Sequence, residues 1–233
     1  MSSFNNYLNS NRSNVIKQGL FYGNPTMDQV NAMSNMNETC ITIFQSGVLN
    51  KYFSMPWQSF TEPSNKVAKL EIEAMISVQP TLTKEDIEFF KKCEDDLEGV
   101  WLDALKKIGI TGIERNDLED FIKLTDGIIY RLKYHYQRPR PLQLAYFYNL
   151  KLYPIIATNA NSPSYPGGHA FDSYRIAYLL AKKHPEKAME LLQIADAVSL
   201  SRIKGGVHYP SDNIISNQMA KELVSHGFFD KYL

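Results

Sequence analysis

The chain has 233 residues, which is enough to bury a substantial hydrophobic core in one or two domains. Its apolar fraction of 44% is that of an ordinary globular protein and argues against extended disorder. Lys plus Arg and Asp plus Glu both number 25, so no overall field attracts nucleic acid or a membrane surface, and any affinity for anions has to come from a local cluster of cations.

The first residues and the cysteines bear on cellular location. The stretch from Met1 to Asn14 is polar and rich in Asn and Ser, unlike a secretory signal. No segment approaches the roughly 18 uninterrupted apolar residues that would span a bilayer. Cys40 and Cys93 lie far apart and belong to no metal or redox motif, so we expect two buried free thiols. These features predict a cytoplasmic protein without a membrane span.

Short elements are expected near the N-terminus. Thr26 is a suitable cap for a short helix that ends near Met36. Residues 39–53 contain β-branched side chains that could form a strand, although a helix fits their surroundings. A loop with two prolines and two aromatic residues follows, and these are Pro56, Trp57, Phe60 and Pro63.

Three long helices are predicted in the middle of the chain. The first runs from about residue 64 to residue 80, with an expected buried face of Val67, Leu70, Ala74 and Val78. The second opens with a capping box at Thr83 and Asp86 and continues to Gly109. The third covers residues 116–136 and ends at the X-Pro pairs that follow, because proline is excluded from a helix interior.

The C-terminal half is also predicted to be helical. The expected helices and loop are a short helix at 142–149, a loop at 154–166, and helices at 168–183, 185–204 and 210–226. No internal repeat or low-complexity tract is present. The sequence therefore predicts an all-α fold, in which residues 1–25 form a loosely structured lead-in and residues 26–233 a single-domain helical bundle.

The first functional pattern is Lys133 followed seven residues later by Arg140-Pro141. This spacing is close to two helical turns, so both cations would point toward one place. Arg131 and Arg138-Pro139 have the same spacing, but a point charge with a planar fork makes complementary phosphate contacts, which favours Lys133 and Arg140. A basic helix end followed by a proline-rich turn would also produce this pattern.

The second pattern is Ser164-Tyr165-Pro166-Gly167-Gly168-His169, which leads into a predicted helix. Glycines at a helix start allow backbone N–H groups to approach an anion, and the helix end adds partial positive charge. His169 would then lie in the first turn, where it could donate a proton to a bound group. A flexible loop before a capped helix is the simpler interpretation of this stretch.

The third pattern places a cation, a histidine and a carboxylate around a glycine pair. Arg202 offers a fork of donors that matches phosphate oxygens, and His208 can act as a nucleophile or base near neutral pH. Asp212 lies one helical turn beyond His208 and could hold its imidazole in one tautomer. Gly205-Gly206 would let the chain reverse so that Arg202 and His208 face one pocket.

Together the three patterns resemble the signature of the type-2 phosphatidic acid phosphatase superfamily, which includes bacterial class A acid phosphatases, membrane lipid phosphatases and vanadium-dependent haloperoxidases. The resemblance implies a helical bundle of the acid phosphatase/vanadium-dependent haloperoxidase type. It also implies that His208 attacks phosphorus and that Asp212 orients its imidazole, while His169 protonates the leaving oxygen and later activates water. The implied phosphate-binding residues are Lys133, Arg140, Arg202, Gly167 and Gly168.

Gly167 departs from this signature, because the family usually has serine there. The missing hydroxyl removes one hydrogen bond to the oxyanion, a net effect of roughly 0.5–1.5 kcal/mol. We expect activity to survive with an altered rate or substrate preference. The two histidines would also have to differ, with His208 neutral to attack and His169 protonated to donate, which requires environments that push their pKa values apart.

The resemblance predicts a soluble, metal-independent phosphatase that acts on phosphomonoesters or pyrophosphate bonds of small metabolites, with nucleotides as one candidate class. No cofactor is expected, and vanadate should bind as a phosphate mimic. A vanadium-dependent haloperoxidase and a non-catalytic phosphate-binding protein with a decayed site are the alternatives. The expected partner is a small phosphorylated substrate, without nucleic acid, and the apolar helix faces are compatible with a homodimer.

Overall fold

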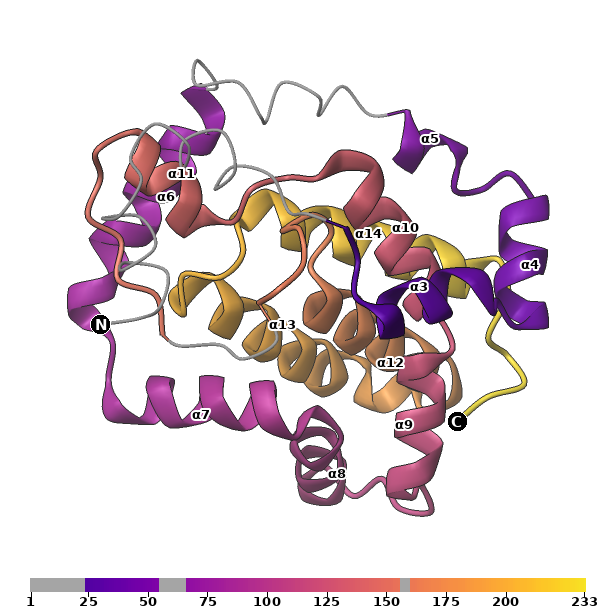
Figure 1. The fold of residues 1–233 in the computed structure, drawn as a ribbon. Helices are drawn as coiled ribbons and strands as arrows, with labels where there is room; N and C mark the ends of the chain where they lie inside the picture. The colour runs from indigo at the N-terminus through magenta and orange to yellow at the C-terminus, as the bar shows by residue number, and fades with distance from the viewer. Residues whose placement is uncertain (1–23, 55–65, 156–159) are drawn as a thin grey trace.

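The computed structural model describes residues 24–54, 66–155 and 160–233, and every regular element in these ranges is a helix (Figure 1). The predicted all-α fold is confirmed. The predicted loop with Trp57 and Phe60 lies outside the described residues, as does nearly all of the lead-in. The division of the chain at residue 25 therefore stays a prediction.

Three helices from the C-terminal half form the centre of the fold (Figure 1). They are α12 (Gly168–Lys183), α13 (Ala188–Lys204) and α14 (Pro210–Ser225), and α12 packs along both of the others. The 3₁₀ turn η3 (Pro185–Lys187) leads into α13. The predicted bounds of α12 and α14 agree with the structure to within one residue, whereas the helix predicted from residue 185 begins as η3 and becomes α13 only at Ala188. Gly168, Pro185 and Pro210 each begin a helical element, because the first helical position tolerates proline.

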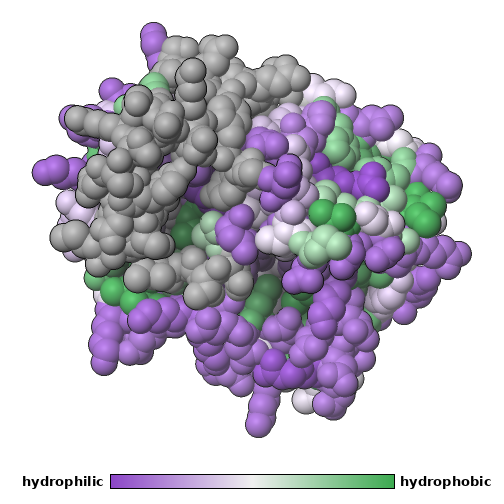
Figure 2. Space-filling model, in the orientation of Figure 1, coloured by the Kyte–Doolittle hydropathy of each residue, from purple (hydrophilic) through white to green (hydrophobic). Residues whose placement is uncertain are grey.

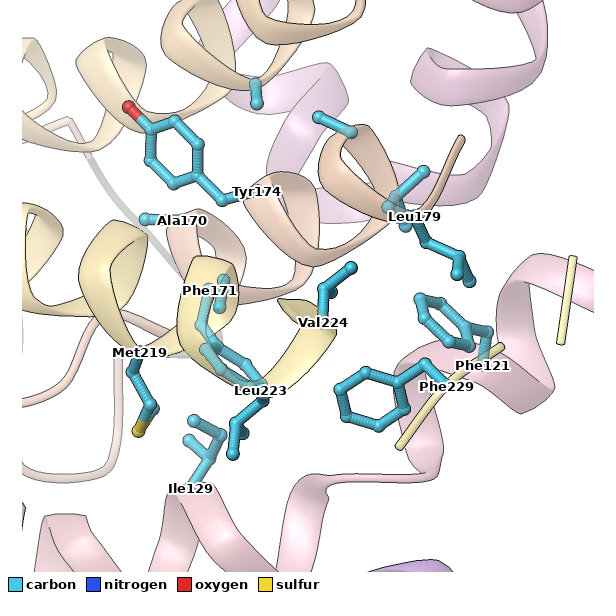
Figure 3. Close-up of a cluster of buried hydrophobic side chains, with 14 of the residues drawn as sticks. Phe121, Ile129, Ala170, Phe171, Tyr174, Leu179, Met219, Leu223, Val224 and Phe229 are labelled. Atoms are coloured by element: carbon cyan, nitrogen blue, oxygen red, sulfur yellow. The ribbon is translucent and has the colours of Figure 1, made fainter. Parts of the chain in front are cut away.

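The hydrophobic core lies where α12 and α14 meet two preceding helices (Figure 3). Phe121 and Phe229 lie edge to face in it, with ring centroids 5.6 Å apart. Phe171 from α12 and Leu223 from α14 are fully buried beside them. Burial of side chains of this size stabilises the fold by roughly 1.5–3 kcal/mol each, so this core fixes α12 relative to α14.

Two of the predicted long helices are each broken into two. The second consists of α7 (Lys84–Asp95) and α8 (Leu97–Lys107), and the third of α9 (Arg115–Lys123) and α10 (Asp126–Tyr136). At the first break Asp96 leaves the helical region, with φ −155° and ψ 67°, and its carboxylate accepts a hydrogen bond from the Gly99 amide at 2.9 Å. Aspartate is a strong N-cap, and here its capping preference overrides the continuous apolar pattern.

The predicted buried face of the first long helix is wrong. This helix, α6 (Lys66–Val78), buries Ala68, Ile72 and Met75, whereas Val67, Leu70 and Val78 are exposed. It packs against α11 (Pro141–Phe147) and continues into the 3₁₀ turn η2 (Gln79–Thr81). The helix therefore has two apolar faces, one with Val67 and Leu70 and one with Ile72 and Met75. The position of α11 decides that the second face is buried.

The remaining helices lie at the opposite end of the view from α6 and α11 (Figure 1). They are α3 (Met27–Ser34), α4 (Glu38–Gln45) and α5 (Asn50–Phe53). Thr26 caps α3 as predicted, and α4 is a helix instead of the strand that its β-branched residues could form. Cys40 and Cys93 are buried free thiols, as expected.

None of the described helices combines the length and the apolar composition needed to cross a bilayer. On the face shown in Figure 2, hydrophilic residues cover most of the described surface, and hydrophobic residues occupy smaller areas.

Candidate active site

A cavity of about 200 Å³ brings the three sequence patterns together. Its lining residues come from α10, α12, the end of α13 and the neighbouring loops, and they are Asp126, Ile129, Tyr130, Lys133, Arg140, Ser162, Gly168, His169, Asp172, Arg202 and His208. Six of the eight predicted site residues are among them. The other two, Gly167 and Asp212, lie directly behind His208, as their contacts below show.

Lys133 and Arg140 are held in the wall by backbone carbonyls. The Lys133 ammonium donates to the Pro163 carbonyl at 2.7 Å. The Arg140 guanidinium donates from Nε to the Ser162 carbonyl and from Nη1 to the Val207 carbonyl, both at 2.9 Å. Both side chains are buried, so their charges act at low effective dielectric. Burial, with Arg140 nearby, lowers the pKa of Lys133 well below its usual value.

The alternative pair with the same spacing lies elsewhere. Arg131 is on the surface and donates to the Met33 carbonyl, with Nη2 at 2.6 Å. Arg138 is buried but points away from the cavity toward Glu71 and Asp212. The structure therefore places Lys133 and Arg140, and not Arg131 and Arg138, at the cavity.

Arg202 lies in the last turn of α13 and is 2% exposed. Its Nη2 donates to a Glu94 carboxylate oxygen in a short ion pair, and its guanidinium carbon lies 4.4 Å from the centroid of the Phe90 ring. Nε and Nη1 have no hydrogen-bond partner among the described residues. A buried donor without a partner is destabilising by roughly 1–3 kcal/mol, and an oxyanion in the cavity would relieve this.

The contacts of His208 determine its tautomer. Nδ1 lies 3.2 Å from an Asp212 carboxylate oxygen, and Nε2 lies 3.0 Å from Nη1 of Arg140. A guanidinium can only donate, so Nε2 carries the lone pair and Nδ1 carries the proton. Burial, with Arg140 second, holds the pKa of His208 well below its usual value, so the ring is neutral. A neutral imidazole with its lone pair on Nε2 is suited to nucleophilic attack once a bound phosphate takes over the Arg140 donor from Nε2.

Asp212 is fully buried and accepts hydrogen bonds from several groups besides His208. These are Arg138 Nη1 at 2.5 Å, Ser164 Oγ at 2.5 Å and the Tyr209 amide at 3.0 Å. Burial alone would raise the pKa of Asp212, but Arg138, His208 and Ser164 outweigh it and hold this pKa far below its usual range. Asp212 therefore stays ionised and fixed, which is what orienting an imidazole requires.

His169 lies in the first turn of α12, with its ring at the cavity. Burial, followed by the charges of Arg202 and His208, lowers the pKa of His169 well below its usual value. Both histidine pKa values are thus shifted in the same direction, and the requirement for a protonated His169 beside a neutral His208 stays a prediction. A phosphate dianion beside Arg202 would raise the pKa of His169 by opposing the cations, so the substrate itself would supply the difference.

The glycine at position 167, just before α12, has a structural cause. Gly167 is the N-cap with φ −76°, a conformation open to any residue, so the backbone does not demand glycine. A Cβ at this position would lie 2.7 Å from Oδ1 of Asn213 and 3.6 Å from Nδ1 of His208. Asn213, whose Nδ2 donates to the Ser199 carbonyl at 2.7 Å, thus takes the space that a serine would need.

The sequence patterns did not predict the role of several residues at the site. Ser164 is part of the second pattern, but its bond to Asp212 was not anticipated. Glu71 and Glu94 could not be found from spacing, because they reach the site from α6 and α7. Asp126 and Asp172 are seven residues before Lys133 and three after His169, and these helical spacings could have revealed them.

No set of three or more His, Cys, Asp and Glu side chains is arranged as a metal site within the described ranges. A comparison with protein families finds that residues 121–220 match the PAP2 superfamily model. These residues belong to the PAP2 superfamily. A search among curated proteins finds no match.

The PAP2 segment runs from α9 into α14 and contains all eight predicted site residues. Membership of the PAP2 superfamily implies phosphatase-type hydrolysis of phosphoesters. Two residues that precede the PAP2 segment also support its site, because Glu94 holds Arg202 and Glu71 holds Arg138.

Proposed function

We propose that this protein is a cytoplasmic, metal-independent phosphatase that hydrolyses small phosphomonoesters through a phosphohistidine intermediate. The observation that carries the proposal is the state of His208, a buried neutral imidazole with its proton on Nδ1 toward Asp212 and its Nε2 lone pair beside Arg140. Pyrophosphate bonds and nucleotides are wider candidates for the same chemistry.

The cations at the cavity supply the fixed positive charge that stabilises the transition state of phosphoryl transfer. The transition state spreads charge over three equatorial oxygens, so catalysis depends mainly on positioning and on fixed positive charge. Lys133, Arg140 and Arg202 provide this charge from three different elements. The amides at the start of α12 add donors, with the partial positive charge of the helix end. The proposal therefore needs no metal ion.

In the first step Nε2 of His208 attacks phosphorus, and the bond between phosphorus and the ester oxygen breaks. The leaving oxygen takes a proton from His169, so the alcohol departs neutral. Nδ1 of His208 keeps its proton, and Asp212 stabilises the positive charge that the ring gains.

In the second step a water molecule attacks the phosphohistidine, and His169, now neutral, accepts the proton of that water. The bond between phosphorus and Nε2 breaks and returns the lone pair to His208. Inorganic phosphate leaves, and both histidines are restored to their starting states.

His208→Ala should abolish hydrolysis of a general phosphomonoester such as p-nitrophenyl phosphate. His135→Ala is the matched control, because His135 is an exposed histidine outside the cavity and its loss should leave the rate unchanged. Vanadate should inhibit the wild type as a phosphate mimic. Quenching in alkaline denaturant with substrate labelled on phosphorus should trap a phosphorylated protein. Its label should be stable in base, lost in acid, and absent from the His208→Ala variant.

Activity of the His208→Ala protein near that of the wild type would rule out the proposed nucleophile. Binding of phosphorylated compounds without turnover by the wild type would indicate a phosphate-binding protein instead. Bromide oxidation in the presence of peroxide and vanadate would indicate a haloperoxidase.

A further inference from the structure

The cavity has an acidic wall that phosphate binding does not explain. Asp126 and Asp172 both line it. The buried Arg175 donates to one oxygen of Asp172 at 2.9 Å, and its charge also acts on Asp126, so this wall sets two carboxylates against one cation. A carboxylate beside a phosphate site would repel a bound phosphate, so its presence there needs a purpose.

Helix geometry places the two kinds of charge at opposite ends of the cavity. Asp126 and Lys133 lie at i and i+7 on one face of α10, so they are about 10 Å apart along its axis. His169 and Asp172 share one face of α12, about 4.5 Å apart along that axis. Asp172 therefore lies about one helical turn from His169, the proposed proton donor to the leaving alcohol.

A second observation shows that the cavity is built for a charged ligand. Arg202 is 98% buried at the other end, yet its Nε and Nη1 have no partner among the described residues. Between the two ends, Tyr130 and Ile129 line the wall. An aromatic face can contact a cation, and an aliphatic side chain can contact methylene groups.

We infer that Asp126 and Asp172 form a subsite for a cationic group on the leaving alcohol, so that the preferred substrates are small phosphomonoesters of amino alcohols. This inference rests on the proposed phosphatase function. The phosphate binds at Lys133, Arg140 and Arg202, and an ammonium a few bonds from the ester oxygen reaches the acidic wall. A second phosphate at this position meets like charge, so the same wall disfavours pyrophosphate.

The size of the cavity supports a small substrate. Its volume of about 200 Å³ is below the roughly 300–1,000 Å³ typical of sites for drug-sized ligands. A phosphate with a short amino-alcohol chain has few atoms beyond the phosphoryl group. O-Phosphoethanolamine is therefore a suitable probe, and n-propyl phosphate is its uncharged counterpart of similar length.

The test compares kcat/KM for these two esters and for pyrophosphate. Burial raises the pKa of Asp126 to about 7 and that of Asp172 to about 6, so assays at pH 8 keep both residues ionised. Ratios between substrates cancel any loss of activity common to all of them. We expect the wild type to prefer O-phosphoethanolamine over n-propyl phosphate by about tenfold or more, as expected for one charged hydrogen-bonded pair.

Two variants test the residues themselves. Asp126→Asn and Asp172→Asn should each lower the ratio of O-phosphoethanolamine to n-propyl phosphate toward one, and both should raise the ratio of pyrophosphate to n-propyl phosphate. General damage to the site would not move these ratios in opposite directions. Asp95→Asn is the matched control, because Asp95 is exposed on α7 and does not line the cavity, so neither ratio should change.

The outcomes separate the two proposals. If the wild type hydrolyses neither ester at pH 8 or at any lower pH down to 5, the proposed function is wrong. If the wild type hydrolyses both esters equally well, phosphatase function stands and the ammonium subsite is refuted. A wild-type preference that both Asn variants retain would likewise overturn the assignment of Asp126 and Asp172.

Discussion

Restoring serine at position 167 should destabilise this protein, and the cause should be Asn213. The added Cβ would lie 2.7 Å from Oδ1 of Asn213, closer than real Cβ contacts come. Asn213 is 4% exposed and tied to the Ser199 carbonyl, so it cannot swing aside freely. Overpacking of this kind is destabilising by roughly 1–3 kcal/mol. The φ of −76° adds no backbone strain, so the whole effect should come from this contact.

A double-mutant cycle measures that contact directly. Asn213→Ala alone should be destabilising by about 1 kcal/mol through loss of its hydrogen bond to Ser199. The double variant with Gly167→Ser should be more stable than the sum of the two single effects, by about 1–2 kcal/mol. For a chain of this size each kcal/mol shifts Tm by about 2–4 °C, which thermal unfolding resolves.

Gly168→Ser provides the neighbouring control. A Cβ there meets only a methyl group of Ile129 at 4.0 Å, so the change should be near neutral for stability. Strict additivity of Gly167→Ser and Asn213→Ala would refute the steric explanation. So would a Gly167→Ser protein as stable as the wild type.

Two further predictions concern catalysis. Arg138→Gln removes the ion pair that fixes Asp212, so kcat should fall roughly ten- to hundredfold with little change in KM. Arg131→Gln on the surface is the control and should change neither constant. A rise in KM at constant kcat would contradict a positioning role for Arg138. The pH profile of kcat/KM reports the pKa values of the free enzyme. Its optimum should lie below pH 6.5, because the reaction needs a neutral His208 and a protonated His169, and the pKa of each histidine is lowered. Since bound phosphate raises the pKa of His169, kcat should persist to higher pH than kcat/KM; coincident profiles with an optimum above pH 7 would show that this assignment is wrong.

The sequence was a good guide wherever local chemistry dominates. Gly168, Pro185 and Pro210 mark helix starts, and the structure has a helical element beginning at each. The capping box at Thr83 is also present as predicted. In each case a single residue restricts its own backbone or caps its own helix, so the local sequence was sufficient to predict where the helix begins.

Predictions that depend on packing were less successful. The breaks at Asp96 and Thr125 interrupt apolar patterns that continue across them. On α6 the pattern allowed either of two faces to be buried, and the contact with α11 selected the one with Ile72. Periodicity records which residues are apolar, but it does not record which partner will cover them.

For the site, the sequence alone supplied the candidate groups and their order, from Lys133 to Asp212, because the three patterns together resemble a known signature. Only the tertiary structure decided that Arg138 serves Asp212, that Glu94 holds Arg202, and that Asn213 leaves no space at Gly167. It also decided that Asp126 and Asp172 face the same cavity. These contacts join residues from separate helices, and the packing that brings them within a few ångströms has no counterpart in local sequence spacing.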